Sequence, residues 1–111
     1  MSTESAPLFT YEVAEAGNAE TGYITTIACH GRVVTQTAGE LKDLVKPLIS
    51  RGGRIVLDFS DVAGVDSQGL GTLVGLKISA LGAGYCTFEC TNLSPRVQEL
   101  LRITKLTHLF S

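Results

Sequence analysis

The sequence predicts one α/β domain built on a mixed four-stranded sheet, with an antiparallel strand at its N-terminal end and the remaining strands parallel. Its 111 residues fit a single domain, 1–111. Apolar residues recur with a period of two or with a helical period, in the order β, β, α, β, α, β, α. Strands that alternate with helices require crossover connections and therefore parallel pairing, so we expect helices flanking the sheet.

The first two strands are predicted to form a hairpin. In "LFTYEV", residues 8–13, Phe9, Tyr11 and Val13 alternate with polar residues, as in a half-buried strand. The small and polar stretch 14–22 is typical of a turn, and "YITTIACH", residues 23–30, is rich in β-branched residues. Residues 1–6 are expected to be a flexible N-terminus.

A helix of about 14 residues is predicted next, because Thr37 and Glu40 have the spacing of a capping box and a helical period follows them. Pro47 predicts a kink or an early end of this helix, since proline removes a backbone hydrogen bond. "RIVLDF", residues 54–59, is an almost unbroken apolar run, which is typical of a central strand covered on both faces.

The second half of the chain repeats this pattern. "SDVAGVDS", residues 60–67, is predicted to be a polar loop, and a helix is expected from Ser67 to the "GAG" at 82–84. Gly71 and Gly75 lower its helix propensity, which predicts that their face packs closely against a neighbour. "YCTFECT" at 85–91 is the fourth strand, and Ser94 with Pro95 begins a third helix.

Composition excludes several classes of protein. Nine basic and eleven acidic residues nearly cancel and form no long run, so a nucleic-acid partner is not expected. No window approaches the ~20 apolar residues of a membrane span, and the start lacks the features of a signal peptide; we expect a cytoplasmic protein without a membrane partner. The three cysteines, Cys29, Cys86 and Cys90, lie in apolar runs and are interpreted as buried thiols.

Enzyme motifs are matched only in part. A serine-hydrolase elbow needs a glycine two residues before and after its serine, and around Ser67 only Gly69 is present, with Val65 in the other place. The candidate bases are His30 and His108. The glycines of "GLGTLVG" miss the dinucleotide-binding spacing by one residue, and no phosphate-binding G-x-x-x-x-G-K-[ST] occurs. We therefore predict no enzyme activity and no cofactor.

Metal ligation is not predicted either. Cys86 and Cys90 would lie about 13 Å apart on one strand at ~3.3 Å per residue, too far to share one zinc ion. Asp58, Asp61 and Asp66 could form a magnesium or acid–base cluster, but three carboxylates near one loop are more often a solvated rim.

Ser67 remains the most informative residue. It is expected at or next to a helix N-terminus, where unpaired N–H groups and the helix dipole favour an anion. A serine at such a position is either a helix cap or a phosphate acceptor.

The segment "RIVLDFSDVAGVDSQGLGTLVGL" strongly resembles the signature of STAS domains, the family named for sulfate transporters and anti-sigma-factor antagonists. The resemblance extends from "GRVVTQTAGEL" at 31–41 to "LSPRVQELLRITKLTHLF" at 93–110. Because no transporter segment accompanies it, the chain is identified as a free-standing STAS-like protein of the antagonist type. The family fold, a mixed sheet with flanking helices, agrees with the order of elements above.

The resemblance implies a regulatory role in partner switching. A serine kinase, often the anti-sigma factor itself, would phosphorylate Ser67; the unphosphorylated protein would bind that kinase and free its sigma factor. A PP2C-type phosphatase would reset the protein, and a weak homodimer is left open. The residues that match the partner-facing segments of the family are Val34, Thr35, Asp66, Gln68, Gly69 and Leu70.

Two positions depart from the family pattern. The family usually has an acidic residue where Val34 stands, and often a second serine where Gln68 stands. These departures predict a different kinase contact, and poor or absent phosphorylation is one outcome of them. The alternative function is a STAS subunit of an ABC-type lipid-transport complex, in which the same helix face would dock an ATPase.

Overall fold

The computed structural model describes residues 8–110, so the expected flexible N-terminus lies outside the described residues. The elements are β1 (Phe9–Asn18), β2 (Gly22–Val33), α1 (Ala38–Arg51), β3 (Gly53–Val65), α2 (Ser67–Ala83), β4 (Cys86–Thr91), α3 (Pro95–Ile103) and α4 (Thr107–Phe110). The sheet order is β1-β2-β3-β4. β1 is antiparallel to β2 and the other pairs are parallel, which confirms the predicted mixed sheet.

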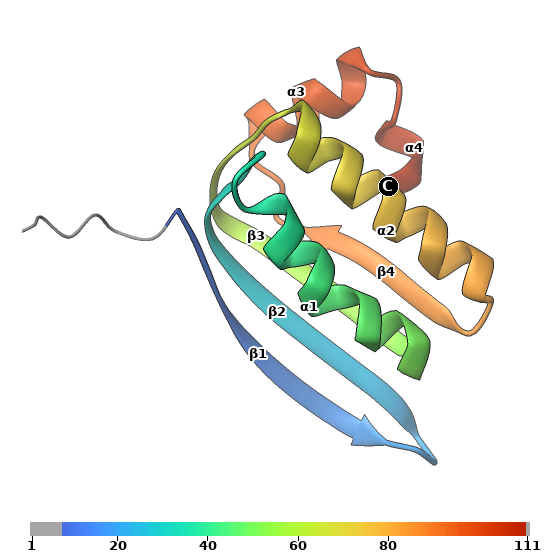
Figure 1. Cartoon of the computed structure of the whole chain (residues 1–111). Coiled ribbons are helices and arrows are strands. Elements are labelled where there is room, and N and C mark those ends of the chain that lie inside the picture. Colours follow the sequence, from blue (N-terminus) through green and yellow to red (C-terminus); the bar gives the residue numbers. More distant parts are fainter. Residues whose placement is uncertain (1–7, 111) are drawn as a thin grey trace, which may run out of the picture.

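Residues 8–110 form two layers, because their helices cover one face of the sheet and leave the other open. α1 and α2 lie side by side over this face, with α3 and α4 near the N-terminal end and outer side of α2 (Figure 1). β3 is central, as predicted, but its expected coverage on both faces is wrong. Ile55, Leu57 and Phe59 are buried beneath the helices, whereas Arg54 is exposed on the opposite face. Val56 is the single apolar residue on that face. Because it lies between Ile55 and Leu57, residues 55–57 form a continuous apolar segment that is typical of a strand covered on both faces.

The first hairpin is longer than predicted. β1 continues through residues 14–18, and only residues 19–21 form the turn. The side-chain oxygen of Asn18 accepts hydrogen bonds from the backbone N–H groups of Glu20 and Thr21 at 2.8 and 2.9 Å, which closes this turn. The expected half-burial of β1 is also wrong, since Phe9 is its only buried residue. Among residues 8–110, no helix covers the rest of the strand.

The predicted polar loop at 60–65 is the second half of β3. Its pairing with β2 shifts register between Ala28 and His30 and again between Gly31 and Arg32. Each shift inserts one additional β3 residue, and such bulges break the alternation by which a strand is identified in a sequence. The extended strand ends at Val65, paired with Val33, and this places the start of α2 beside the end of β2.

The helices begin and end close to the predicted residues, but only one of the two predicted side-chain caps, at α1 and α3, is formed. α1 runs from Ala38 to Arg51 and contains Pro47, so the expected early end is wrong. The predicted capping box is also wrong: the buried Thr37 hydroxyl donates to the carbonyl of Arg32 at 2.7 Å and accepts from the N–H of Val34 at 2.9 Å. Thr37 therefore holds together the loop before α1. Ser94 caps α3 as predicted, accepting from the N–H of Val97 at 3.3 Å.

The three cysteines are buried and free, as predicted. Burial raises the pKa of the Cys29 and Cys90 thiols to about 12. Both thiols therefore stay protonated at neutral pH, and a protonated, buried thiol is a poor nucleophile and a poor metal ligand. Within residues 8–110, no helix is both long enough and apolar enough to span a membrane.

The three aspartates considered as a cluster have separate partners. Asp58 accepts from the Asn92 side chain at 3.0 Å, Asp61 contacts His30, and Asp66 binds groups near the start of α2. In the part of the chain that the structure describes, no group of three or more His, Cys, Asp or Glu residues is arranged to hold a metal ion.

His30 joins three strands on the open face of the sheet. Its Nε2 lies 2.7 Å from a Glu12 oxygen on β1, and its Nδ1 lies 2.7 Å from an Asp61 oxygen on β3. These hydrogen bonds, to Glu12 first and Asp61 second, raise the pKa of His30 above its ordinary value of 6.5. A raised pKa stabilises the folded state below the pKa of the unfolded chain, and this contribution is lost as pH rises through the folded-state pKa.

We expect the melting temperature to fall between about pH 6 and pH 8, and this part of the pH dependence to disappear in His30→Gln. Thermal unfolding followed by circular dichroism across this range measures both curves. A wild-type curve parallel to that of His30→Gln would contradict the stabilising role of the protonated imidazole.

Candidate partner-binding and phosphorylation site

Ser67 is the first residue of α2 and is exposed, whereas the helix cap is its neighbour Asp66. Asp66 has the extended backbone of an N-cap residue, and its Oδ1 accepts from the N–H of Gly69 at 2.8 Å. The Ser67 hydroxyl makes no hydrogen bond to any residue in the range 8–110. It is therefore not needed as a cap and faces solvent.

The second oxygen of Asp66 ties α2 to the loop before α1. Oδ2 accepts from the backbone N–H of Thr35 at 2.9 Å and from its hydroxyl at 3.1 Å. These bonds, the one from Gly69 above all, hold the pKa of Asp66 below its ordinary value, so the carboxylate is ionised at neutral pH. Thr35 and Asp66, which are 31 positions apart in the chain, are thus brought together beside Ser67.

The six residues with predicted partner contacts differ in exposure. Thr35 and Gln68 are exposed, Val34 and Asp66 are half-buried, and Gly69 and Leu70 are buried. A Cβ atom on Gly69 would lie 1.9 Å from the carbonyl oxygen of Val33, so only glycine lets α2 approach β2 this closely. Direct partner contacts of Gly69 and Leu70 stay a prediction; in this structure the two residues position the exposed ones.

The expected close packing of Gly71 and Gly75 is wrong. A Cβ on either would meet nothing within 4 Å. Helical spacing places them on the solvent side of α2 with Ser67 and with two large exposed side chains, Ile78 and Leu81. We call this set, Ser67, Gly71, Gly75, Ile78 and Leu81, the outward face of α2.

No charged residue interrupts the outward face. α2 contains no acidic residue, and its single basic residue, Lys77, donates to the carbonyl of Phe88 on β4 at 2.8 Å. A helix at the surface usually carries charges on its solvent side, so this face has the composition of a protein-binding surface. The presence of only one charged residue, Lys77, in 67–83 is a signal that sequence reasoning could have used and missed.

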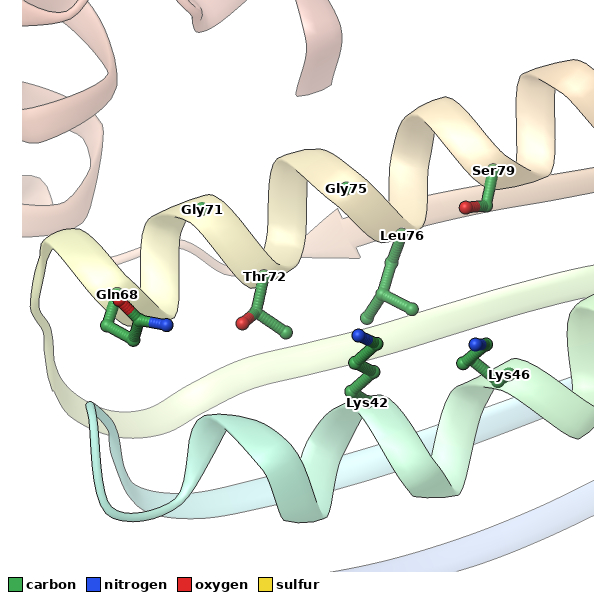
Figure 2. A pocket seen from close by; sticks show the side chains of 8 residues that line it. All are labelled: Lys42, Lys46, Gln68, Gly71, Thr72, Gly75, Leu76 and Ser79. Carbon is green, nitrogen blue, oxygen red and sulfur yellow. The ribbon is translucent and has the colours of Figure 1, made fainter.

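A groove of about 400 Å³ separates α2 from α1 (Figure 2). Lys42 and Lys46 extend from α1 toward α2, one helical turn apart. Neither forms an ion pair within residues 8–110. The groove begins at Gln68, beside Ser67, and runs to Ser79. The outward face is therefore bordered along α1 by positive charge.

The serine–base pair of a hydrolase is not formed here. His30 is engaged by Glu12 and Asp61 on the open face of the sheet. His108 lies on α4 and makes no hydrogen bond to Ser67 in the described part of the chain. Within residues 8–110, neither histidine is therefore hydrogen-bonded to Ser67 as the general base that activates a serine nucleophile.

Comparison with known proteins finds a matching family model and solved structures of similar fold. The model of the STAS_2 family, described as "Mlab, STAS domain", matches residues 17–111. An anti-sigma factor antagonist from Mycobacterium paratuberculosis is similar in structure, with a TM-score of 0.73, 18% identity, and coverage of 96% of this chain and 87% of that chain. These values show a shared fold.

SpoIIAA, described as an anti-sigma factor antagonist, has the same fold in two states. Its unphosphorylated form aligns with a TM-score of 0.69 and 18% identity, covering 92% of this chain and 86% of that chain. The phosphorylated form of the Bacillus protein, a cell fate determinant, aligns with a TM-score of 0.64 and 16% identity, covering 92% and 89%.

Proposed function

Because the chain belongs to the STAS_2 family of MlaB-type STAS domains, we propose that it is a phosphorylation-controlled protein-binding module, an anti-sigma-factor antagonist. In this proposal the unphosphorylated protein binds a serine kinase that also acts as an anti-sigma factor. Phosphorylation of Ser67 releases the kinase, and a PP2C-type phosphatase resets the protein. The protein acts in the cytoplasm, regulates transcription without binding nucleic acid, and catalyses no reaction itself.

The observation that carries this proposal is the free hydroxyl of Ser67 at one end of the outward face of α2. Asp66 serves as the cap, so the Ser67 hydroxyl can be modified without removing a structural hydrogen bond. A kinase must enclose its acceptor, which is possible for an exposed residue at a helix start. The fold match to SpoIIAA, which has been solved in both phosphorylation states, supports the same assignment.

The phosphoryl transfer is an ordinary kinase reaction. The Ser67 oxygen bonds to the γ-phosphorus of ATP, the bond to the β–γ bridging oxygen breaks, and the hydroxyl proton passes to a base on the kinase. ADP is the leaving group. This chain contributes the nucleophile and its position; the partner contributes the metal ions and the base.

The residues around Ser67 define what the kinase would contact. Thr35 and Gln68 are exposed beside it, and Val34 is half-buried where the family usually has an acid. An acidic side chain would offer an ion pair to a basic kinase residue, and valine offers only apolar contact. The kinase would therefore recognise this protein through polar and apolar contacts. The Asp66 carboxylate already accepts hydrogen bonds from Thr35 and Gly69 of the same chain.

Incubation with the cognate kinase and ATP tests the proposal. The intact mass is expected to rise by one phosphate in wild type and in Ser79→Ala, and to stay unchanged in Ser67→Ala. Ser79 is the matched control because it is also an exposed serine of α2. An unchanged wild-type mass while the kinase phosphorylates another substrate, or a gain that persists in Ser67→Ala, refutes Ser67 as the acceptor.

A second function, that of a STAS subunit docking the ATPase of an ABC-type lipid-transport complex, is favoured by two observations. The matching family model is itself described by MlaB, and the outward face of α2 is apolar and uncharged, as in a permanent interface. Copurification with a transporter ATPase, with binding unchanged in Ser67→Asp, would select this function. Loss of binding in Ser67→Asp would select the phosphorylation-controlled one.

A further inference from the structure

The outer edge of β1 is unprotected. The strand has ten residues and pairs only with β2, and within residues 8–110 no strand lies along its other side. Figure 1 shows that α1 and α2 leave this edge uncovered. Natural edge strands are usually blocked by shortness, proline, lysine or a bulge. β1 contains neither proline nor lysine, and its register with β2 is unbroken over its whole length.

The side chains of β1 also favour association. Tyr11 and Val13 are 38% and 43% exposed on the helix-bearing side of the sheet, in register with the buried residues Cys29 and Ile27. Both β1 carboxylates are compensated within the chain. Glu12 contacts His30 at 2.7 Å, and Glu15 contacts Arg51 at 3.1 Å.

One contact shows which backbone N–H and C=O groups of β1 point away from β2. The carbonyl of Leu8 accepts from the N–H of Arg32 at 2.8 Å, so the backbone groups of Leu8 point toward β2. In an antiparallel pair this direction alternates with each residue. The N–H and C=O groups of every second residue therefore point outward, unpaired, namely those of Phe9, Tyr11, Val13, Glu15 and Gly17.

We propose that a second copy of the chain pairs with this edge, β1 against β1 in antiparallel orientation, with Val13 on the two-fold axis. In this register Val13 faces Val13 of the second copy, Tyr11 faces Glu15, and Phe9 faces Gly17. Each of these pairs exchanges two backbone hydrogen bonds, so all the outward groups are satisfied. A two-fold axis needs such a self-complementary surface.

Like-charge repulsion disfavours two of the nearby registers. An axis at Glu12 would place Glu12 against itself, and an axis at Glu15 would do the same for that residue; like charges directly opposite are destabilising. With the axis at Val13, Glu12 faces Ala14 instead. The dimer extends the sheet across both copies and leaves exposed Ser67, which begins α2 on the helix-bearing face and not on β1, accessible. The inference is independent of the proposed function.

Cysteine cross-linking tests the register. The native cysteines are all buried, so in Val13→Cys the new thiol is the one that is exposed. Paired residues at the axis have Cα atoms about 5.5 Å apart, which is within disulfide range. We expect oxidised Val13→Cys to run as a covalent dimer on a non-reducing gel. Glu15→Cys is the control and should run as a monomer on the same gel, because its two thiols would lie about 13 Å apart along the strands and could not be cross-linked.

Sedimentation equilibrium tests the dimer itself. Wild type is expected to be a reversible dimer, and Val13→Lys, which places two ammonium groups at the axis, should raise the dissociation constant at least about tenfold. Ile78→Lys, an exposed apolar residue on α2, should leave it unchanged. Circular dichroism checks that both variants fold.

Four outcomes overturn the proposal. One is a wild-type protein that is monomeric up to about 1 mM, well above the range of a specific dimer. Another is a dimer that Ile78→Lys dissociates and Val13→Lys does not, which would place the contact on α2. The third is equal cross-linking of Val13→Cys and Glu15→Cys, which would indicate chance collision. A wild-type monomer whose β1 edge instead captures a strand of another protein also counts against a second copy as the occupant.

Discussion

Replacing Gly69 by alanine is expected to destabilise the protein by about 3 kcal/mol, the upper part of the range for overpacking. The new methyl group would lie 1.9 Å from the Val33 carbonyl oxygen and 2.7 Å from its carbon. These are backbone atoms, so the clash cannot be relieved by rotating a side chain. α2 would have to move away from β2, which would strain the contact between the Asp66 N–H and the same carbonyl, now 3.3 Å.

Gly71→Ala is the matched control, two positions along the same helix. A Cβ at Gly71 meets nothing within 4 Å, so this change should stabilise the protein by about 0.5–1 kcal/mol through helix propensity alone. Urea unfolding of both variants at one pH measures the difference. If Gly69→Ala were as stable as Gly71→Ala, the close approach of α2 to β2 would not be a constraint on this fold.

Phosphorylation of Ser67 is expected to weaken binding of the partner kinase by up to about a hundredfold. The phosphate adds about −1.5 to −2 charges at pH 7. At ~6 Å and an effective dielectric of about 20, each unit-charge repulsion from an acidic partner group contributes roughly 2–3 kcal/mol before salt screening. The outward face of α2 has no charged side chain to pair with the phosphate, so enclosing it in the interface adds a desolvation cost.

Isothermal titration calorimetry with the phosphorylated and unphosphorylated protein measures this change. Ser67→Asp carries one charge and should show a smaller loss of affinity than the phosphoprotein. Ser79→Asp adds the same charge farther along α2, at the far end of the groove that contains Lys42 and Lys46, and should retain more affinity. Equal affinities for wild type and the phosphoprotein would contradict control by charge at this site.

Local signals in the sequence were sufficient for most of the fold. The start of α2 at Ser67, the Ser94 cap and the alternation of strands with helices all appear in the structure because each depends on nearby residues. The errors occurred where pairing overrode the local pattern. Residues 60–65 have a polar, loop-like composition, yet β2 holds them in β3 through two bulges.

For the candidate site, too, the sequence predicted some features and missed others. It predicted Ser67 as the phosphoacceptor and the segments that surround it, but the role it gave to the glycines was wrong. Gly71 and Gly75 were expected to pack closely and are exposed, whereas Gly69 makes the close contact. Which glycine faces a neighbouring backbone depends on how the whole helix is rotated and placed, and this is set by residues distant in sequence.

By itself the sequence determined the order of the elements, the family and the serine at a helix start, because hydrophobic period and capping chemistry act over a few residues. Only the tertiary structure decided that Asp66 is the cap and bonds to Thr35, that the outward face of α2 is accessible, and that β1 has an open edge. These features arise from contacts between segments that meet only when the sheet has formed, and their energies depend on distances that no local pattern encodes.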